Sequence, residues 1–75
     1  SIEYDLPSDA YTVVTVFDVM GKHVKTLINK NQDAGFKTVR WDAKNDKGEN
    51  VSAGMYIYQI KSGANVASKK MILLR

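Results

Sequence analysis

Cysteine is absent from this 75-residue chain, and histidine and proline occur only once each. Without cysteine the chain can form no disulfide, no thiolate nucleophile and no cysteine metal site. No window approaches the run of about 18 apolar residues that a membrane-spanning helix requires, and the first residues lack the basic-then-apolar pattern of a signal peptide. We therefore expect a soluble domain, with any signal peptide lying outside these residues.

The composition is that of one ordinary folded domain, because 44% of the residues are hydrophobic and 25% are charged in a mass of 8.4 kDa. We expect a single domain over residues 1–75.

The net charge of +3 is unevenly spread: residues 1–20 carry four acidic side chains and no basic one, and residues 50–75 carry four basic side chains and no acidic one. Segments of opposite charge can attract if they pair as neighbouring strands. The basic residues are interspersed with hydrophobic ones, which does not favour nucleic-acid binding.

Alternation of apolar and polar residues between turn signals predicts β-strands and no helix. The expected strands are 2–6, 11–18, 23–28, 36–42, 55–61 and 66–74, and the polar segment 29–35 is expected to be a loop. Two segments with Asp or Asn first and Gly fourth, residues 18–21 and 45–48, predict tight turns. Six or seven short antiparallel strands bury their apolar faces best as a small β-sandwich, so the fold class is all-β.

Three aromatic residues occupy alternating strand positions. Tyr56 and Tyr58 share one face of their predicted strand, and Trp41 is expected in the core. An exposed arrangement of the same rings would be a platform for stacking sugars, so a carbohydrate-binding accessory module stays open as an alternative.

Catalytic and metal sites find little support. His23 follows a turn, and a small sandwich offers little concavity for a nucleophile, base and acid to gather, so we expect no catalysis.

The oxygen-rich loop 42–50 invites comparison with a calcium loop. Its Asn45 and Asp46 are adjacent rather than alternate, Lys44 and Lys47 are basic, and Gly54 stands where a bidentate Glu is needed. We expect a turn held by side-chain hydrogen bonds, with no cofactor and no metal.

Five segments in this order resemble a known family. They are residues 3–7 (EYDLP), 14–24 (VTVFDVMGKHV), 35 with 39–42 (G, VRWD), 48–58 (GENVSAGMYIY) and 69–75 (KKMILLR). The ordered set resembles the C-terminal sorting domain of proteins exported by the type IX secretion system, and it is similar to the related immunoglobulin-like domain of the flagellar hook-capping protein. The resemblance covers nearly the whole chain. Ala43 and Ala53 depart from the family pattern, which often has Gly and Ser there.

The resemblance implies an immunoglobulin-like sandwich that acts as a non-catalytic secretion signal. Its implied partners are an upstream cargo domain joined covalently, the outer-membrane secretion machinery and a sortase-like peptidase, and its implied location is the cell surface or the medium, reached through the periplasm. The residues matching the two late motifs are the candidates for partner recognition: Gly54, Met55, Tyr56, Lys69, Lys70, Met71 and Leu73. A short basic edge strand could pair with a partner by strand addition.

One other alternative stays open beside the carbohydrate-binding module. A structural immunoglobulin-like module, of the hook-capping type or a spacer in an adhesin, would share the fold without being recognised or cleaved. The ending at Arg75 favours the sorting domain, since such a domain ends its protein.

Overall fold

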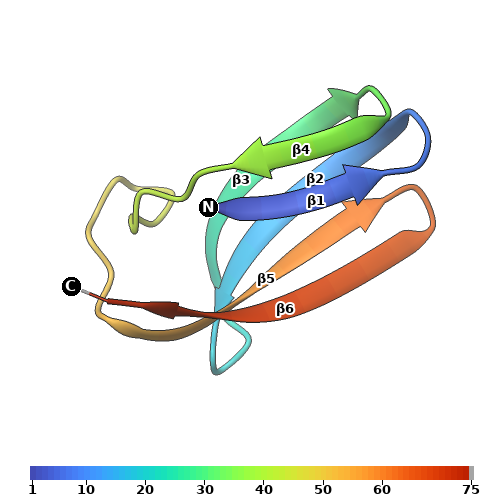
Figure 1. The fold of residues 1–75 in the computed structure, drawn as a ribbon. Helices are drawn as coiled ribbons and strands as arrows, with labels where there is room; N and C mark the ends of the chain where they lie inside the picture. The colour runs from blue at the N-terminus through green and yellow to red at the C-terminus, as the bar shows by residue number, and fades with distance from the viewer. Residues whose placement is uncertain (75) are drawn as a thin grey trace.

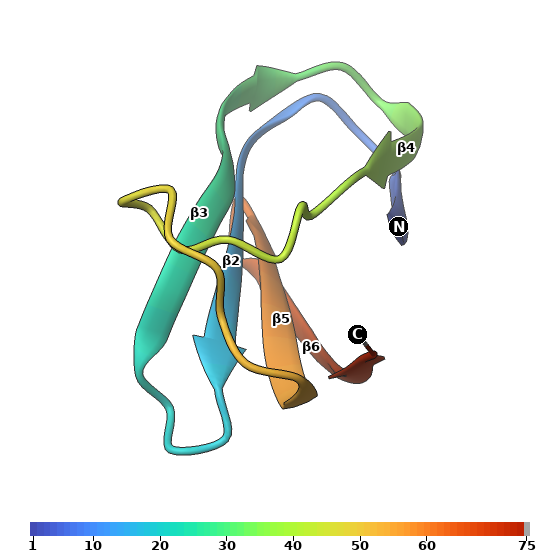
Figure 2. The same cartoon turned by 90° about the vertical axis from the view of Figure 1, so that its left-hand side faces the viewer.

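The computed structural model describes residues 1–74, which form six β-strands and no helix, and hence no helix that could cross a membrane (Figure 1). The strands are β1 (Ile2–Leu6), β2 (Ala10–Asp18), β3 (His23–Gln32), β4 (Gly35–Val39), β5 (Gly54–Ser62) and β6 (Asn65–Leu73). They form two antiparallel sheets, one in the order β1-β4 and one in the order β3-β2-β5-β6. Figure 2 shows the smaller sheet facing the larger one. The predicted all-β sandwich is confirmed.

The core forms where the centre of the larger sheet faces β1. β2 has a neighbour on each side, and its residues Val14 and Val16 are fully buried. The inward positions of β1 alternate with exposed ones, as the sequence pattern predicts, and bury Ile2, Tyr4 and Leu6. These three residues form one hydrophobic cluster with Val14. Burial of this cluster is the main favourable contribution to folding.

The prediction of a loop at residues 29–35 is wrong for its first half. β3 continues to Gln32, and Asn29 to Gln32 pair with Val13 to Ala10 of β2. Backbone hydrogen bonds to β2 hold this extension. Its side chains can be polar because they are mostly exposed to solvent and do not pack into the core. Two register shifts, at Val14/Thr15 and Val16/Phe17, interrupt the pairing of β2 with β3.

The strand predicted at residues 36–42 is also shorter in the structure. β4 ends at Val39, so Trp41 lies beyond it and is half-buried rather than a core residue. Its indole N–H donates to the carbonyl oxygen of Lys44 at 2.9 Å, and its ring meets that of Tyr56 edge-on at 5.1 Å. The prediction that Trp41 belongs to a strand is wrong, because its hydrogen bond ties it to the loop that follows.

The last strand is an edge strand, as expected, but it is not short. β6 has nine residues, as many as β5, and pairs with β5 along its whole length. Its residues from Asn65 to Lys70 are exposed. Arg75, which also belongs to the predicted basic end, lies outside the described residues.

Candidate functional site

The two late motifs, far apart in the sequence, lie side by side on the hairpin of β5 and β6. Gly54 is directly opposite Leu73, Met55 is opposite Ile72, and Tyr56 is opposite Met71. Lys69 and Lys70 lie further along β6, opposite Tyr58 and Ile57. The structure thus brings all seven predicted recognition residues together on one hairpin at the edge of the larger sheet.

Gly54 has a backbone conformation that few other residues adopt. Its φ angle is +146°, and a Cβ atom added there would meet no atom within 4 Å. The glycine is therefore explained by the bend at the start of β5 and not by a close approach of another segment.

Tyr56 is a core residue as well as a motif residue. It is only 6% exposed, and its hydroxyl donates to the carbonyl oxygen of Ser52 at 2.6 Å. Met71 and Leu73 are half-buried on the same face, whereas Met55 faces the other side of the sheet and is exposed. Only part of the candidate set is thus accessible to a partner without unfolding.

The two lysines of the terminal motif are exposed and point to opposite faces of β6, because neighbouring residues of a strand alternate. Lys69 shares the inner face with Tyr58, and Lys70 shares the outer face with Ile57. Once both are predicted on one strand, this division follows from the alternation alone, and the structure shows which lysine lies on which face.

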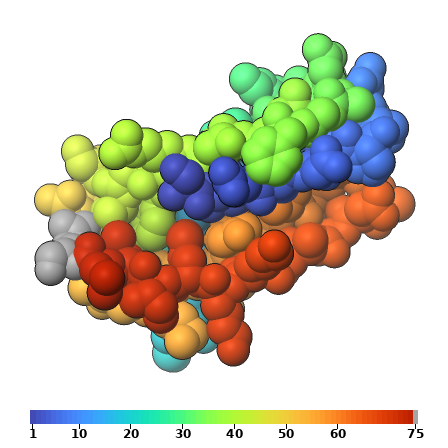
Figure 3. Space-filling view, viewed as in Figure 1, coloured from blue at the N-terminus to red at the C-terminus, as the bar shows by residue number. Residues whose placement is uncertain are grey.

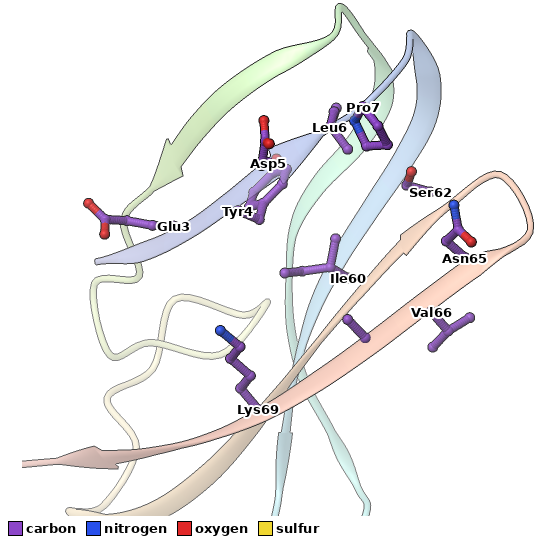
Figure 4. Close-up of a pocket in the computed structure, with 11 residues that line it drawn as sticks. Glu3, Tyr4, Asp5, Leu6, Pro7, Ile60, Ser62, Asn65, Val66 and Lys69 are labelled. Carbon is purple, nitrogen blue, oxygen red and sulfur yellow. The ribbon is translucent and has the colours of Figure 1, made fainter.

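A groove of about 270 Å³ separates β1 from the β5–β6 hairpin (Figure 4). Its apolar lining comes from Tyr4, Leu6, Pro7, Ile60, Val66 and Ala67. Charged residues of both signs stand at its rim: Glu3 and Asp5 on β1, and Lys69 on β6. Acidic residues from the beginning of the chain and a basic residue from its end therefore line the same groove. They meet across a groove and are not paired as strands.

Tyr4, which lines this groove, is also hydrogen-bonded to the end of β3. Its hydroxyl donates to Oε1 of Gln32 at 2.6 Å. Burial raises the pKa of the Tyr4 hydroxyl above its ordinary value of 10.0, and the bond to Gln32 partly opposes this shift.

A second cluster joins the loop after β4 to the outer edge of β3. Asp46 Oδ2 lies 2.6 Å from His23 Nε2, and Asp46 Oδ1 accepts a hydrogen bond from the backbone N–H of Thr26 at 3.1 Å. The backbone N–H of Asp46 donates to the carbonyl oxygen of Val24 at 3.1 Å. Sequence reasoning missed this contact, because Asp46 and His23 are 23 positions apart. The loop here covers an edge that would otherwise expose unpaired backbone groups.

The hydrogen bonds from His23 and Thr26 hold the pKa of Asp46 below its ordinary value. A carboxyl group with a lowered pKa in the folded state stabilises the fold above its ordinary pKa of 3.8, and this contribution is lost as the pH falls through the lowered value. We therefore expect Asp46→Asn to lower the stability at pH 7 and the deficit to vanish towards pH 2. Urea denaturation at both pH values measures this. Asp33→Asn, which removes an exposed carboxylate just beyond the other end of β3, controls for net charge, and a deficit that persists unchanged at pH 2 would contradict the role of the Asp46 carboxylate.

Apart from Asp46, whose carboxylate contacts β3, the loop considered for calcium uses side-chain oxygens within the turn. Asn45 Oδ1 accepts from the backbone N–H groups of Lys47 and Glu49, both at 3.0 Å, and Asp42 Oδ1 accepts from that of Lys44 at 3.2 Å. These are the side-chain hydrogen bonds that the sequence predicts for a polar turn.

The aromatic residues weighed as a sugar platform do not lie on one exposed surface. Tyr56 is buried, Trp41 packs edge-on against it, and Tyr58 packs against the core. The rings most open to solvent are Tyr11 and Phe36, which belong to different sheets.

Comparison with known proteins gives one finding. No curated protein and no solved structure matches the chain. The family model of the FlgD Ig-like domain matches residues 1–65, which contain β1 to β5 and the turn into β6. Because this match covers most of the 75 residues, the chain belongs to the FlgD Ig-like domain family.

Proposed function

We propose that this chain is a non-catalytic, immunoglobulin-like structural module of a larger protein. The match to the FlgD Ig-like domain over residues 1–65 carries the proposal. The sandwich described above is suited to such a role, because its buried core supports a fixed arrangement of exposed strands and loops.

The turns within the three hairpin-like connections lie opposite the first and last strand ends. The β1–β2, β3–β4 and β5–β6 turns all lie at one end of the sandwich, and β1 begins and β6 ends towards the opposite end (Figure 1). An even number of antiparallel strands has this effect.

A fusion experiment tests this function. Residues 1–75 are joined to the C-terminus of a periplasmic reporter enzyme, and the fusion is expressed in a bacterium that has the type IX secretion system. A structural module should leave reporter activity unchanged and the fusion in the periplasm, and the module should unfold as its own cooperative transition. Export of the fusion in this host, and its loss when the secretion machinery is deleted, would overturn the structural function.

Export in that experiment would support the second candidate, a type IX sorting signal. The observation that favours this candidate is the register of β5 and β6, which places the two late motifs opposite each other at a sheet edge. A partner could add a strand to the free edge of β6, with backbone pairing supplying affinity and the lysines supplying steering. The partners would then be the outer-membrane machinery and a sortase-like peptidase, and the location would be the cell surface or the medium.

For the sorting candidate, Lys69→Glu with Lys70→Glu should trap the fusion in the periplasm. Both side chains are exposed, so the stability should change by no more than about 0.5 kcal/mol per site. The matched control is Lys22→Glu with Lys30→Glu, which changes the net charge equally at two exposed lysines, one just before β3 and one near its end, at the opposite edge of the larger sheet. Export of the Lys69→Glu, Lys70→Glu fusion at the level of the control would refute the charge mechanism.

A further inference from the structure

The smaller sheet is two strands narrower than the larger sheet that it faces. It contains only β1 and β4, whereas the larger sheet contains four strands. Figure 3 shows β1 and β6 on the same side of the molecule, with β5 visible between them. The first half of the inner face of β6 is consequently uncovered: Ala67 and Lys69, which share a face with Ile60 and Tyr58, are both exposed, whereas Met71 and Leu73 further along are half-buried.

The strand beside this uncovered surface has an unpaired edge. Within residues 1–74, β1 pairs with β4 on one side and with no strand on the other. A free edge presents backbone N–H and C=O groups at strand spacing, which is the template for adding another strand. A strand added there would lie above the inner face of β6 and would fill the groove of about 270 Å³.

The charges around the groove specify the chemistry of such a strand. Glu3 and Asp5 are exposed on the outer face of β1, since Ile2, Tyr4 and Leu6 point inward. Residues of an added strand that share this outer face would lie beside the two carboxylates, so basic side chains fit there. Residues on the inner face would lie over Ile60 and Ala67, where apolar side chains fit.

One inner position differs from the others. Lys69 points from β6 into the space below β1 (Figure 4). Covering this ammonium group with an apolar side chain would leave a charge without a partner, which is costly. An acidic side chain fits opposite Lys69. A second copy of the chain fits poorly, because a twofold contact through this opening would bring Lys69 of both copies together.

We propose that the groove accepts an extended segment of a partner polypeptide, which adds to the free edge of β1. The segment alternates basic residues, placed beside Glu3 and Asp5, with inward residues that are apolar over Ile60 and Ala67 and acidic over Lys69. This site goes beyond the structural function and is distinct from the free edge of β6, where the sorting candidate would place its partner. It gives the module a binding activity of its own.

The probe is the seven-residue peptide Lys-Leu-Lys-Val-Lys-Glu-Lys, in which lysine alternates with the three inward residues. Its ends are blocked, and it is titrated to 2 mM into the isotope-labelled 75-residue chain while amide NMR shifts are recorded. We expect saturable shifts concentrated at residues 2–6, 60 and 67–69, together with slower hydrogen exchange in β1. A peptide of the same composition with leucine and valine adjacent is the control, and it should bind at least about tenfold more weakly because its apolar residues no longer share a face.

Charge exchange tests the assignment of each side chain. Glu3→Lys with Asp5→Lys should weaken binding at least about tenfold, because attraction becomes repulsion at both positions. Lys69→Glu should weaken binding of the same peptide, and replacing the peptide's glutamate by lysine should restore it for this variant. The three side chains are exposed, and far-ultraviolet circular dichroism checks that the variants stay folded.

Three outcomes would overturn the proposal. The first is an absence of shifts at 2 mM peptide, and the second is a set of shifts centred on the edge of β6 or on β3. The third is self-association of the unliganded chain through β1, which sedimentation would detect and which would make a second copy the occupant. Each result is independent of the reporter fusion, so failure here leaves the structural function standing.

Discussion

Tyr56→Ala should leave most of the molecules unfolded at 25 °C. Removing a large buried aromatic side chain costs about 3–5 kcal/mol, and a domain of this size rarely has more than about 3–5 kcal/mol of stability in total. Tyr56 is 6% exposed and also supports the ring of Trp41, so the structure offers little to refill the cavity. Urea denaturation followed by circular dichroism measures the loss.

Tyr56→Phe is the matched control, because it keeps the ring and removes only the hydroxyl bonded to Ser52. Its cost should be about 0.5–1.5 kcal/mol, the usual contribution of one hydrogen bond. A Tyr56→Ala protein that melts within a few degrees of the parent would contradict the buried position. The two variants also separate two explanations for the sorting candidate. Loss of export in Tyr56→Ala would reflect unfolding of the domain, whereas loss of export in Tyr56→Phe would indicate that the partner recognises the hydroxyl.

Ile2→Ala should have an effect of similar size. Ile2 is 2% exposed and belongs to the cluster that joins β1 to the larger sheet, and truncating a buried isoleucine costs about 2–5 kcal/mol. The effect should be strong for so short a strand, because β1 has five residues and only β4 as a neighbour. Thermal and urea denaturation would show a destabilised or unfolded protein.

Glu3→Ala controls for the position, because it alters the next residue of the same strand on its exposed face. It should change the stability by no more than about 0.5 kcal/mol. Equal losses in the two variants would show that the strand tolerates no substitution at all and would argue against a specific role of the buried side chain.

The sequence was most informative where one face of a strand is buried. Alternation in residues 2–6 predicted β1 with its correct ends, and β-branched residues predicted β2 to within one residue. The same reasoning failed at residues 29–32, where β3 continues with polar side chains. Residues 29–32 are in a strand because their backbone pairs with β2. The residues that would predict this extension are therefore those of β2 and not those of the segment itself.

The candidate site was predicted only as a set of residues. The motifs around Gly54 and Lys69 could be found by their order in the chain, but their opposition across β5 and β6 depends on a register fixed by the turn at Ser62 to Asn65. The contact of Asp46 with His23, and the groove between β1 and β6, join segments 23 or more residues apart. Such contacts follow from how the sheets stack, which local patterns do not encode.

Trp41 gives the protein a built-in optical probe. It is the sole tryptophan, and it is tied to the loop of residues 41–51 by its bond to Lys44 while its ring touches Tyr56. Its fluorescence therefore reports whether that loop is docked, whereas circular dichroism reports the sheets. If the loop detaches before the sandwich melts, the two signals will separate along a denaturant titration, and the loop will be seen to open as a local unit of lower stability.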